Sequence, residues 1–493
     1  MLLAFLLAAA VQGVVIEQSS GRPVARAEVT LARLAGDGAE ERVTKIRSDP
    51  SGQFRFSPLD GGTYLLHVNR RGFAEGRYRQ RRPGGPPAPF DLAAGANLFA
   101  ELRLVRLGAV SGTVYDANGV GLPGFPVVVY EAGPPLRQAA SATTDERGWW
   151  RAGSLAPGRY LARTGPGTLE DGSEWLPTFS FLSRGPEDAR RAEVQLEQEV
   201  IGMDIQPTPG RQFAISGEVQ GPFAPGSVTV SVTLSSGLGR QAVQAACCPA
   251  RFRFARLTPE NYELFAEVAG EPEAAWLFGF YNDEKRDIVL ELGQPPETSF
   301  RISPPEAPPV TLLARRKDLA GPGETREIQA TGARLAPGYW EIQARPASGW
   351  YLTRFGSGRR FPSWAGWDPD WFETMVMGRG PTTAVLDLAQ GTGGVYGTVT
   401  LADSKPVPWA PVYLHPESTD VRRRMAGIRT GRAGANGRYT FDDLVPGDYL
   451  LLSSYDLTEA TPEVMTRAGA VRVSLASGQR TEQALRLHQR PED

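Results

Sequence analysis

The chain has 493 residues and a net charge of −2, from 53 basic and 55 acidic side chains. This balance gives no electrostatic case for binding nucleic acid or an anionic membrane surface, so we expect neither as a partner. The 56 glycines and 41 prolines lie between short apolar runs, a distribution typical of turns in an all-β protein.

The amino terminus is an apolar run, residues 1–11, that contains Ala8-Ala9-Ala10. It resembles the apolar region and small-residue cleavage site of a secretory signal peptide. No Lys or Arg precedes the run, so a buried first strand is the alternative. We predict a signal peptide at residues 1–10 and export to the periplasm or the extracellular surface. No segment is apolar and long enough to predict a transmembrane helix.

One motif occurs five times, at intervals of roughly one hundred residues, which is the size of a domain rather than of a solenoid repeat. In the last copy, Tyr439 and Phe441 alternate with polar residues, and an apolar run follows a Pro-Gly pair. This predicts a hairpin of strand, tight turn and strand, in which Gly447 takes the positive φ of a type II turn. The same φ is expected at Gly158. The copies begin at Leu59, Leu155, Leu257, Leu335 and Leu444.

Further strands are predicted around each copy from alternating or short apolar runs. In the first unit they are residues 11–16, 27–31, 43–47, 54–56 and 65–68. Equivalent openings are residues 110–114, 215–219 and 395–399, whereas the fourth unit keeps mainly the motif itself. Each unit is expected to close with a last strand, found within residues 90–104, 192–205 and 384–388.

The order of these patterns resembles the carboxypeptidase regulatory-like domain. The shared patterns are x-G-x-V, then G-x-P-V-x-x-A-x-V-x-L, then D-x-x-G-x-F/Y-x-F, and then L-x-P-G-x-Y. The resemblance implies a transthyretin-like β-sandwich of about seven strands, and it is clearest in units one, two and five. It also implies an exported bacterial protein without a catalytic module.

The predicted fold is therefore all-β, a tandem array of about five transthyretin-like or Ig-like β-sandwich domains. We place carboxypeptidase regulatory-like domains at residues 11–105, 106–207 and 391–493. Two divergent sandwiches are expected at residues 208–294 and 295–390, the second with an aromatic-rich loop.

Catalytic motifs are missing from the sequence. The metallo-carboxypeptidases that carry such a regulatory domain hold zinc with an H-x-x-E pair, and none of the three histidines, His67, His415 and His488, begins one. No G-x-S-x-G nucleophile turn or G-x-x-x-x-G-K-S/T phosphate loop occurs. We predict that the chain is not an enzyme and has no catalytic residues, metal site or cofactor.

The two cysteines, Cys247 and Cys248, are adjacent. A disulfide between neighbours is strained and rare, and a metal site would need more ligands than this region offers. We expect two free thiols on a turn.

Aromatic residues crowd the end of the fourth unit. Exposed tryptophans on a sandwich rim would stack on the apolar faces of sugars, whereas buried ones would seal the loop over the core. The predicted carbohydrate-binding residues are Trp350, Trp364, Trp367 and Trp371.

These observations favour a non-enzymatic, exported binding or structural module at the cell envelope, with a carbohydrate or an envelope protein as its partner. One alternative is an accessory or substrate-presenting subunit of an envelope enzyme or transporter. A hydrolase with an unrecognised site is the other.

Overall fold

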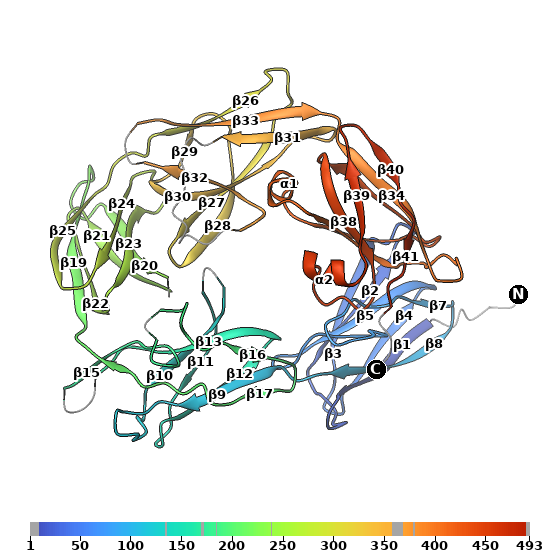
Figure 1. Ribbon diagram of the computed structural model, residues 1–493, viewed down its shortest axis with the longest axis horizontal. Helices are drawn as coiled ribbons and strands as arrows, with labels where there is room; N and C mark the ends of the chain where they lie inside the picture. Colours follow the sequence, from blue (N-terminus) through green and yellow to red (C-terminus); the bar gives the residue numbers. More distant parts are fainter. Residues whose placement is uncertain are drawn as a thin grey trace, which may run out of the picture. The chain divides into compact units, whose positions relative to one another are not determined.

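The computed structural model describes residues 9–133, 136–168, 172–183, 185–237, 239–356, 368–377 and 380–489. The chain is 57% strand and 3% helix and forms a tandem β-sandwich array (Figure 1), as predicted. It divides into two compact units. The first contains Met1–Leu107, Ser348–Tyr351 and Gln390–Asp493, and the second contains Gly108–Ala347 and Leu352–Ala389.

Each sandwich pairs two sheets, which differ in size in the first three domains and have four strands each in the fourth and fifth. In the first domain these are β4-β1-β8 and β3-β2-β5-β6, with β7 also paired to β5. The first strand of the repeat is the middle strand of the smaller sheet, where β1 runs antiparallel to β4 and parallel to β8. The strands are β1 (Ala9–Glu17), β2 (Glu28–Leu34), β3 (Glu40–Arg47), β4 (Gln53–Leu59), β5 (Gly62–Asn69), β6 (Gly76–Arg77), β7 (Phe90–Leu92) and β8 (Asn97–Leu104).

The second domain repeats this topology with sheets β12-β9-β17 and β11-β10-β13-β16. A short sheet, β14-β15-β18, follows it. The strands are β9 (Gly108–Thr113), β10 (Pro126–Glu131), β11 (Arg137–Thr143), β12 (Trp149–Leu155), β13 (Gly158–Thr164), β14 (Gly167–Thr168), β15 (Glu174–Leu176), β16 (Ala192–Val194), β17 (Glu199–Val200) and β18 (Thr208–Pro209).

The third domain has sheets β22-β19-β25 and β21-β20-β23-β24. Its strands are β19 (Phe213–Gln220), β20 (Val228–Ser236), β21 (Gly239–Cys247), β22 (Ala250–Leu257), β23 (Glu260–Val268), β24 (Ala274–Tyr281) and β25 (Lys285–Glu291). The fourth has sheets β29-β26-β33-β31 and β28-β27-β30-β32. Its strands are β26 (Glu297–Ser303), β27 (Thr311–Asp318), β28 (Gly321–Ile328), β29 (Ala333–Arg334), β30 (Gly338–Arg345), β31 (Trp350–Gly356), β32 (Phe372–Val376) and β33 (Thr382–Gln390).

The fifth domain has sheets β37-β34-β40, with β41 also on β34, and β36-β35-β38-β39. It contains both helices of the described part of the chain, each of six residues. Its elements are β34 (Gly393–Thr400), β35 (Pro411–Pro416), α1 (Thr419–Arg424), β36 (Arg429–Arg432), β37 (Arg438–Leu444), β38 (Gly447–Ser453), α2 (Pro462–Arg467), β39 (Val471–Leu475), β40 (Arg480–Glu482) and β41 (Leu485–Arg486).

The motif that occurs five times is a crossing between sheets. The strands before and after it, such as β37 and β38, belong to different sheets of one sandwich. The predicted hairpin is therefore wrong, because the residue pattern of a tight turn does not specify whether the two strands pair. The predicted type II turn is also wrong. Gly447 has the expected positive φ, but its value of +157° is far from the roughly +80° of a type II turn, and Gly158 is not among the residues with positive φ.

A left-handed residue before the motif leucine starts the crossing instead. Ser154, Arg256 and Asp443 have φ values of 62°, 59° and 55°. In each of these three domains the register with the neighbouring strand shifts at this point, which is the mark of a β-bulge. The bulge bends the strand out of the sheet that contains the opening strand and directs the chain to the other sheet of the sandwich.

A hydrogen bond to the backbone closes every crossing. The tyrosine hydroxyl donates to the carbonyl oxygen four residues earlier, at 2.8 Å from Tyr64, Tyr160 and Tyr262. Tyr449 makes the same bond to Val445. Trp340 replaces the tyrosine in the fourth copy and donates through Nε1 to Ala336 at 2.8 Å. The arrangement is like the tyrosine corner of immunoglobulin domains, and it explains why only Tyr or Trp occupies this position.

We predict that Tyr449→Phe destabilises the fifth domain by about 1–3 kcal/mol, because it leaves the buried Val445 carbonyl without a donor. Tyr396→Phe in the same domain is the control, since that ring is exposed on the outer face of β34. Urea unfolding of the full chain, followed by hydrogen exchange in β35 and β38, measures the difference. Equal midpoints for the two variants would contradict the role of the corner.

The cysteines form a disulfide, Cys247–Cys248, at the end of β21. Both side chains are buried in the core of the third domain. The expectation of free thiols is therefore wrong, because the rarity of disulfides between neighbours is a general tendency that does not decide a particular pair. The expected position is correct, since Cys248 lies in the short connection between β21 and β22.

The first residues described belong to the first sandwich. Ala9 and Ala10 are fully buried in β1, and the Ala10 amide donates to the Ala96 carbonyl at 2.9 Å. The signal peptide at residues 1–10 stays a prediction, and cleavage after Ala10 would remove two residues from this strand.

The first and fifth domains contact each other within the first compact unit. Trp409 packs against the cluster of Ala32, Leu34 and Leu65. Arg81 is 3.5 Å from Asp456, and the Arg432 guanidinium donates to the Pro87 carbonyl at 3.4 Å.

Candidate functional site

The outer face of sheet β4-β1-β8 is the candidate site. Alternation along each strand sends one set of side chains into the core and the other set outward. Arg55, Gln12 and Phe99 form one row across the three strands, because Gln12 is in register with the other two. The next row consists of Gln53, Val14 and Glu101, because Val14 is in register with the other two. We call these six residues the outer face.

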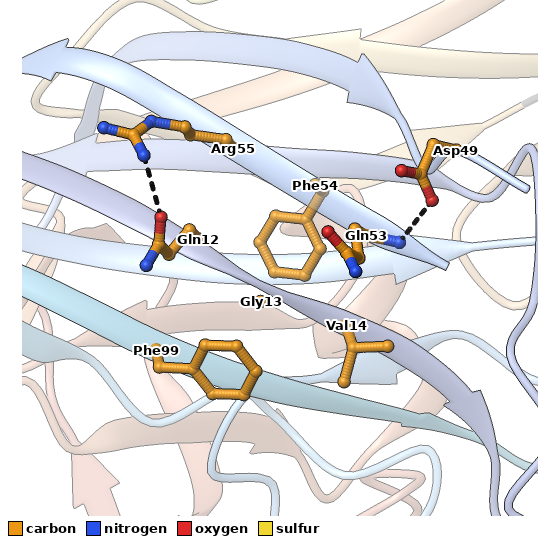
Figure 2. Close-up of a pocket in the computed structure, with 8 residues that line it drawn as sticks. All are labelled: Gln12, Gly13, Val14, Asp49, Gln53, Phe54, Arg55 and Phe99. Carbon is orange, nitrogen blue, oxygen red and sulfur yellow. Dashed lines mark hydrogen bonds between the residues drawn. The ribbon is translucent and has the colours of Figure 1, made fainter. Parts of the chain in front are cut away.

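A shallow pocket of about 480 Å³ lies on this surface. Figure 2 shows Gln12, Val14 and Phe99 around it, with Arg55 and Gln53 contributed by β4. The Phe99 side chain is 64% exposed, although a phenylalanine is usually buried. The pocket therefore combines an exposed aromatic ring with amide and guanidinium groups.

Local hydrogen bonds hold the polar side of the pocket. The Arg55 guanidinium donates to Gln12 Oε1 at 3.0 Å. Asp49 accepts from the Gln53 backbone amide at 2.8 Å, which fixes the start of β4. At the far edge Arg103 and Glu101 form an ion pair of 2.6 Å. These contacts orient the side chains while leaving amide and guanidinium hydrogens free for a ligand.

Gly13 lies between the outward-facing Gln12 and Val14 and has the core-facing parity of β1. A Cβ atom at this position would collide with the Ala100 carbonyl of β8 and the Phe54 ring. Glycine is therefore required for the parallel strands to approach. Equivalent collisions would occur at Gly112, Gly217 and Gly397, which explains the glycine in the opening strand of four repeats.

The second and fifth domains also expose an aromatic ring on the sheet that contains the opening strand. In the second domain Trp149 is 43% exposed, and Arg151 and Glu199 form an ion pair of 2.9 Å on the same sheet. In the fifth domain Tyr396 is 38% exposed, and the Arg480 guanidinium lies 5.9 Å from its ring centroid. An exposed ring beside an arginine is thus a recurrent feature of these faces.

The four predicted tryptophans are only partly described. Trp364 and Trp367 lie outside the described residues. Trp350 is half-buried in β31 and belongs to the first compact unit. Trp371 is only 8% exposed, and the Arg315 guanidinium lies 4.1 Å from its ring centroid. Carbohydrate binding by these four residues stays a prediction, and one face of Trp371 is already occupied.

Phe99 was not singled out from the sequence, although its pattern contains the information. Ala100, Leu102 and Leu104 share one parity along β8 and are buried, so Phe99 must point to the opposite side. The alternation is hard to see in the sequence because Leu98, Phe99 and Ala100 form an unbroken apolar run.

The described residues contain no group of three or more His, Cys, Asp or Glu side chains arranged to hold a metal ion. In the same part of the chain, no helix has the length and apolar character needed to span a membrane.

Comparisons with solved structures give matches at low identity. The minor pilin GBS52 of Streptococcus agalactiae is 13% identical, with a TM-score of 0.26, and covers 41% of this chain and 97% of its own. The shaft pilin SpaA of Lactobacillus rhamnosus GG is 12% identical with the same score and coverage. The Bacillus anthracis TIE protein is 10% identical, with a TM-score of 0.17, and covers 94% of this chain and 69% of its own. Matches of this kind say nothing about what the chain binds.

No curated protein sequence matches the chain. A family model does match its first sandwich, from the buried β1 strand to the residues just after β7. Residues 10–94 match the carboxypeptidase regulatory-like domain, as the sequence patterns predicted.

Proposed function

We propose that the chain is a non-enzymatic binding and structural module of the cell envelope, exported to the periplasm or the cell surface. Its ligand is an extended carbohydrate that lies across the outer face of the first domain. The observation that carries the proposal is the exposed Phe99 ring beside the polar pocket of Gln12, Gln53 and Arg55. We further propose domain boundaries near residues 106, 208, 295 and 391.

The chemistry of the outer face suits a sugar polymer. An aromatic ring offers an apolar surface for the C–H face of a sugar, while amide and guanidinium groups bond its hydroxyls. The face is open and without a deep cavity, so it can accept a chain of residues rather than a single enclosed one.

A single face should bind weakly. By analogy with stacked nucleobases, one ring contributes about 1–3 kcal/mol. Exposed rings on the second and fifth domains can add avidity if they reach the same polymer. A long polysaccharide, which presents many equivalent sites, is therefore favoured over a short oligosaccharide.

The test is sedimentation of the full chain with insoluble polysaccharides such as cellulose, chitin and peptidoglycan. We expect retention on at least one polymer, and we expect Phe99→Ala to weaken it by about 5- to 150-fold, as loss of one stacked ring implies. Phe280→Ala is a matched control, because Phe280 is 63% exposed but lies in β24 of the third domain.

Two results would contradict the proposal. Equal retention of the wild type and Phe99→Ala would remove the outer face as the binding surface. Release of soluble sugars from any polymer would contradict the non-enzymatic assignment.

A further inference from the structure

A second pocket, of about 260 Å³, lies between the second and third domains inside the second compact unit. Strands β10 and β13 line one side, and β20 to β23 line the other. Its apolar walls include Val128, Pro177 and Leu234. We call it the Arg163 pocket after the charged residue on β13.

Arg163 has an unmet hydrogen-bonding requirement. Its side chain is half-buried, its guanidinium lies 5.3 Å from the centroid of the Phe179 ring, and its buried Nε–H has no acceptor in the described structure. Burial lowers the pKa of Arg163, and the charge of Glu260 and a side-chain hydrogen bond with Tyr130 oppose this shift, so the unmet requirement is that of Nε alone. A buried donor without an acceptor is costly, so an acceptor supplied by a ligand would stabilise the site.

The other charged groups of the pocket leave it cationic. Arg240 is neutralised by Asp318, with bonds of 2.6 and 2.8 Å. Arg256 is exposed at the rim, and Glu260 is the one carboxylate among the residues that line the pocket. Burial raises the pKa of Glu260, which favours its neutral form.

Two tyrosines complete the polar lining. Burial raises the pKa of both Tyr130 and Tyr262, so their hydroxyls stay neutral near pH 7. Tyr262 donates to the Thr258 carbonyl at 2.8 Å, so the proton of this hydroxyl is already used in the crossing of the third domain. The guanidinium of Arg163 is therefore the group best placed to receive an anion.

We propose that the Arg163 pocket binds a small organic carboxylate, with one carboxylate oxygen accepting from Arg163 and the C–H groups of the ligand against Val128, Pro177 and Leu234. Arginine forks match carboxylates geometrically, and the volume suits a molecule of roughly sugar size. This site is separate from the outer face and does not depend on the proposed polysaccharide binding.

The test is isothermal titration of the full chain with D-glucuronate and D-glucose, which differ only in the carboxylate. We expect glucuronate to bind and glucose to bind about tenfold more weakly or not at all, because a charge-assisted bond is lost. Titration with acetate measures how much of the affinity comes from the carboxylate alone. Inorganic phosphate that binds more tightly than glucuronate, or glucose that binds equally, would overturn the assignment.

Variants locate the site. Arg163→Gln should weaken glucuronate binding about tenfold or more, whereas Arg159→Gln, exposed on the same strand, should leave it unchanged. Equal binding by the wild type and a folded Arg163→Gln variant would contradict the proposal.

The Glu260→Gln variant provides a second binding test, which does not depend on whether the Arg163 variant folds. Because Glu260 repels an anion when ionised, we expect wild-type affinity to rise as pH falls from about 8 to about 5, where the ligand stays ionised. Glu260→Gln should bind more tightly than the wild type at the upper pH and lose this dependence. Burial raises the pKa of Tyr130 and Tyr262 further above this range. An unaltered pH profile in Glu260→Gln would contradict the proposal.

Discussion

Replacing Arg316 by methionine is expected to destabilise the contact between the third and fourth domains by about 3–5 kcal/mol. Arg316 on β27 donates to the Glu263 carboxylate on β23, and Glu263 is fully buried. The guanidinium also lies 3.6 Å from the centroid of the Phe265 ring. Without Arg316, Glu263 would keep only the bond from Trp276 Nε1, at 2.9 Å, so a buried charge would lose its counter-ion.

The pH dependence of this defect follows from Glu263. Burial raises its pKa in the folded protein, and Arg316 lowers it. A raised carboxyl pKa favours the folded state at low pH, and this contribution is lost as pH rises through the folded pKa. Removal of Arg316 raises the pKa further, so the defect should be largest near neutral pH and should shrink on acidification.

Hydrogen exchange in peptides covering β23 and β27 of the full chain measures the effect. The control is the double variant Arg316→Met with Glu263→Gln, which keeps an acceptor for Trp276 and removes the buried charge. We expect it to recover most of the lost protection. A single variant as protected as the wild type at neutral pH would contradict the account of this ion pair.

Trp150→Ala is expected to destabilise the second domain by about 3–5 kcal/mol, because it leaves a large cavity in the core. Trp150 is 1% exposed and packs in the cluster that contains Val110, Val129 and Met203. This cost corresponds to faster amide exchange, by about 100- to 1,000-fold or more, in β9 and β10 if exchange requires opening of this domain.

The adjacent tryptophan provides the control. Trp149 precedes Trp150 on β12 but points to the opposite face, where it is 43% exposed. Trp149→Ala should change stability by less than about 1 kcal/mol, as surface substitutions usually do. If the two variants were equally destabilised, the alternation assigned to β12 would be wrong.

Much of the fold could be predicted because its strands are locally encoded. Tyr439 and Phe441 alternate with polar residues and are buried on one side of β37, as expected. The five copies of one motif revealed five similar sandwiches, since each copy carries the same Leu and the same Tyr or Trp. Periodicity and turn residues depend on neighbours in sequence, which a single sequence contains.

Contacts between distant residues could not be predicted in this way. The crossing at Pro446-Gly447 looks like a hairpin until the partner strands are known. Arg316 and Glu263 are ordinary charged residues in their own segments, and only the approach of two domains buries them together. The same holds for Arg163 and Glu260, which meet in a pocket formed by two sandwiches.

The two candidate sites also differ in whether a local sequence pattern or the contact of distant strands defines them. The tryptophan content of the sequence predicted a binding site at the end of the fourth unit. In the structure, the Arg315 guanidinium lies over the ring of Trp371 from that set. The outer face depends on strand register, because Gln12, Arg55 and Phe99 come from three separate strands. Composition therefore indicates where aromatic rings gather, whereas strand register is needed to tell which rings are exposed.

The most direct test of the proposed function is hydrogen–deuterium exchange of the full chain with and without the polysaccharide that retains it. The account predicts slower exchange in β1, β4 and β8, which carry the outer face, and little change in β24 around Phe280. Protection confined to residues 350–372, with no change in β1, β4 and β8, would contradict the outer face and assign binding to the aromatic-rich segment instead.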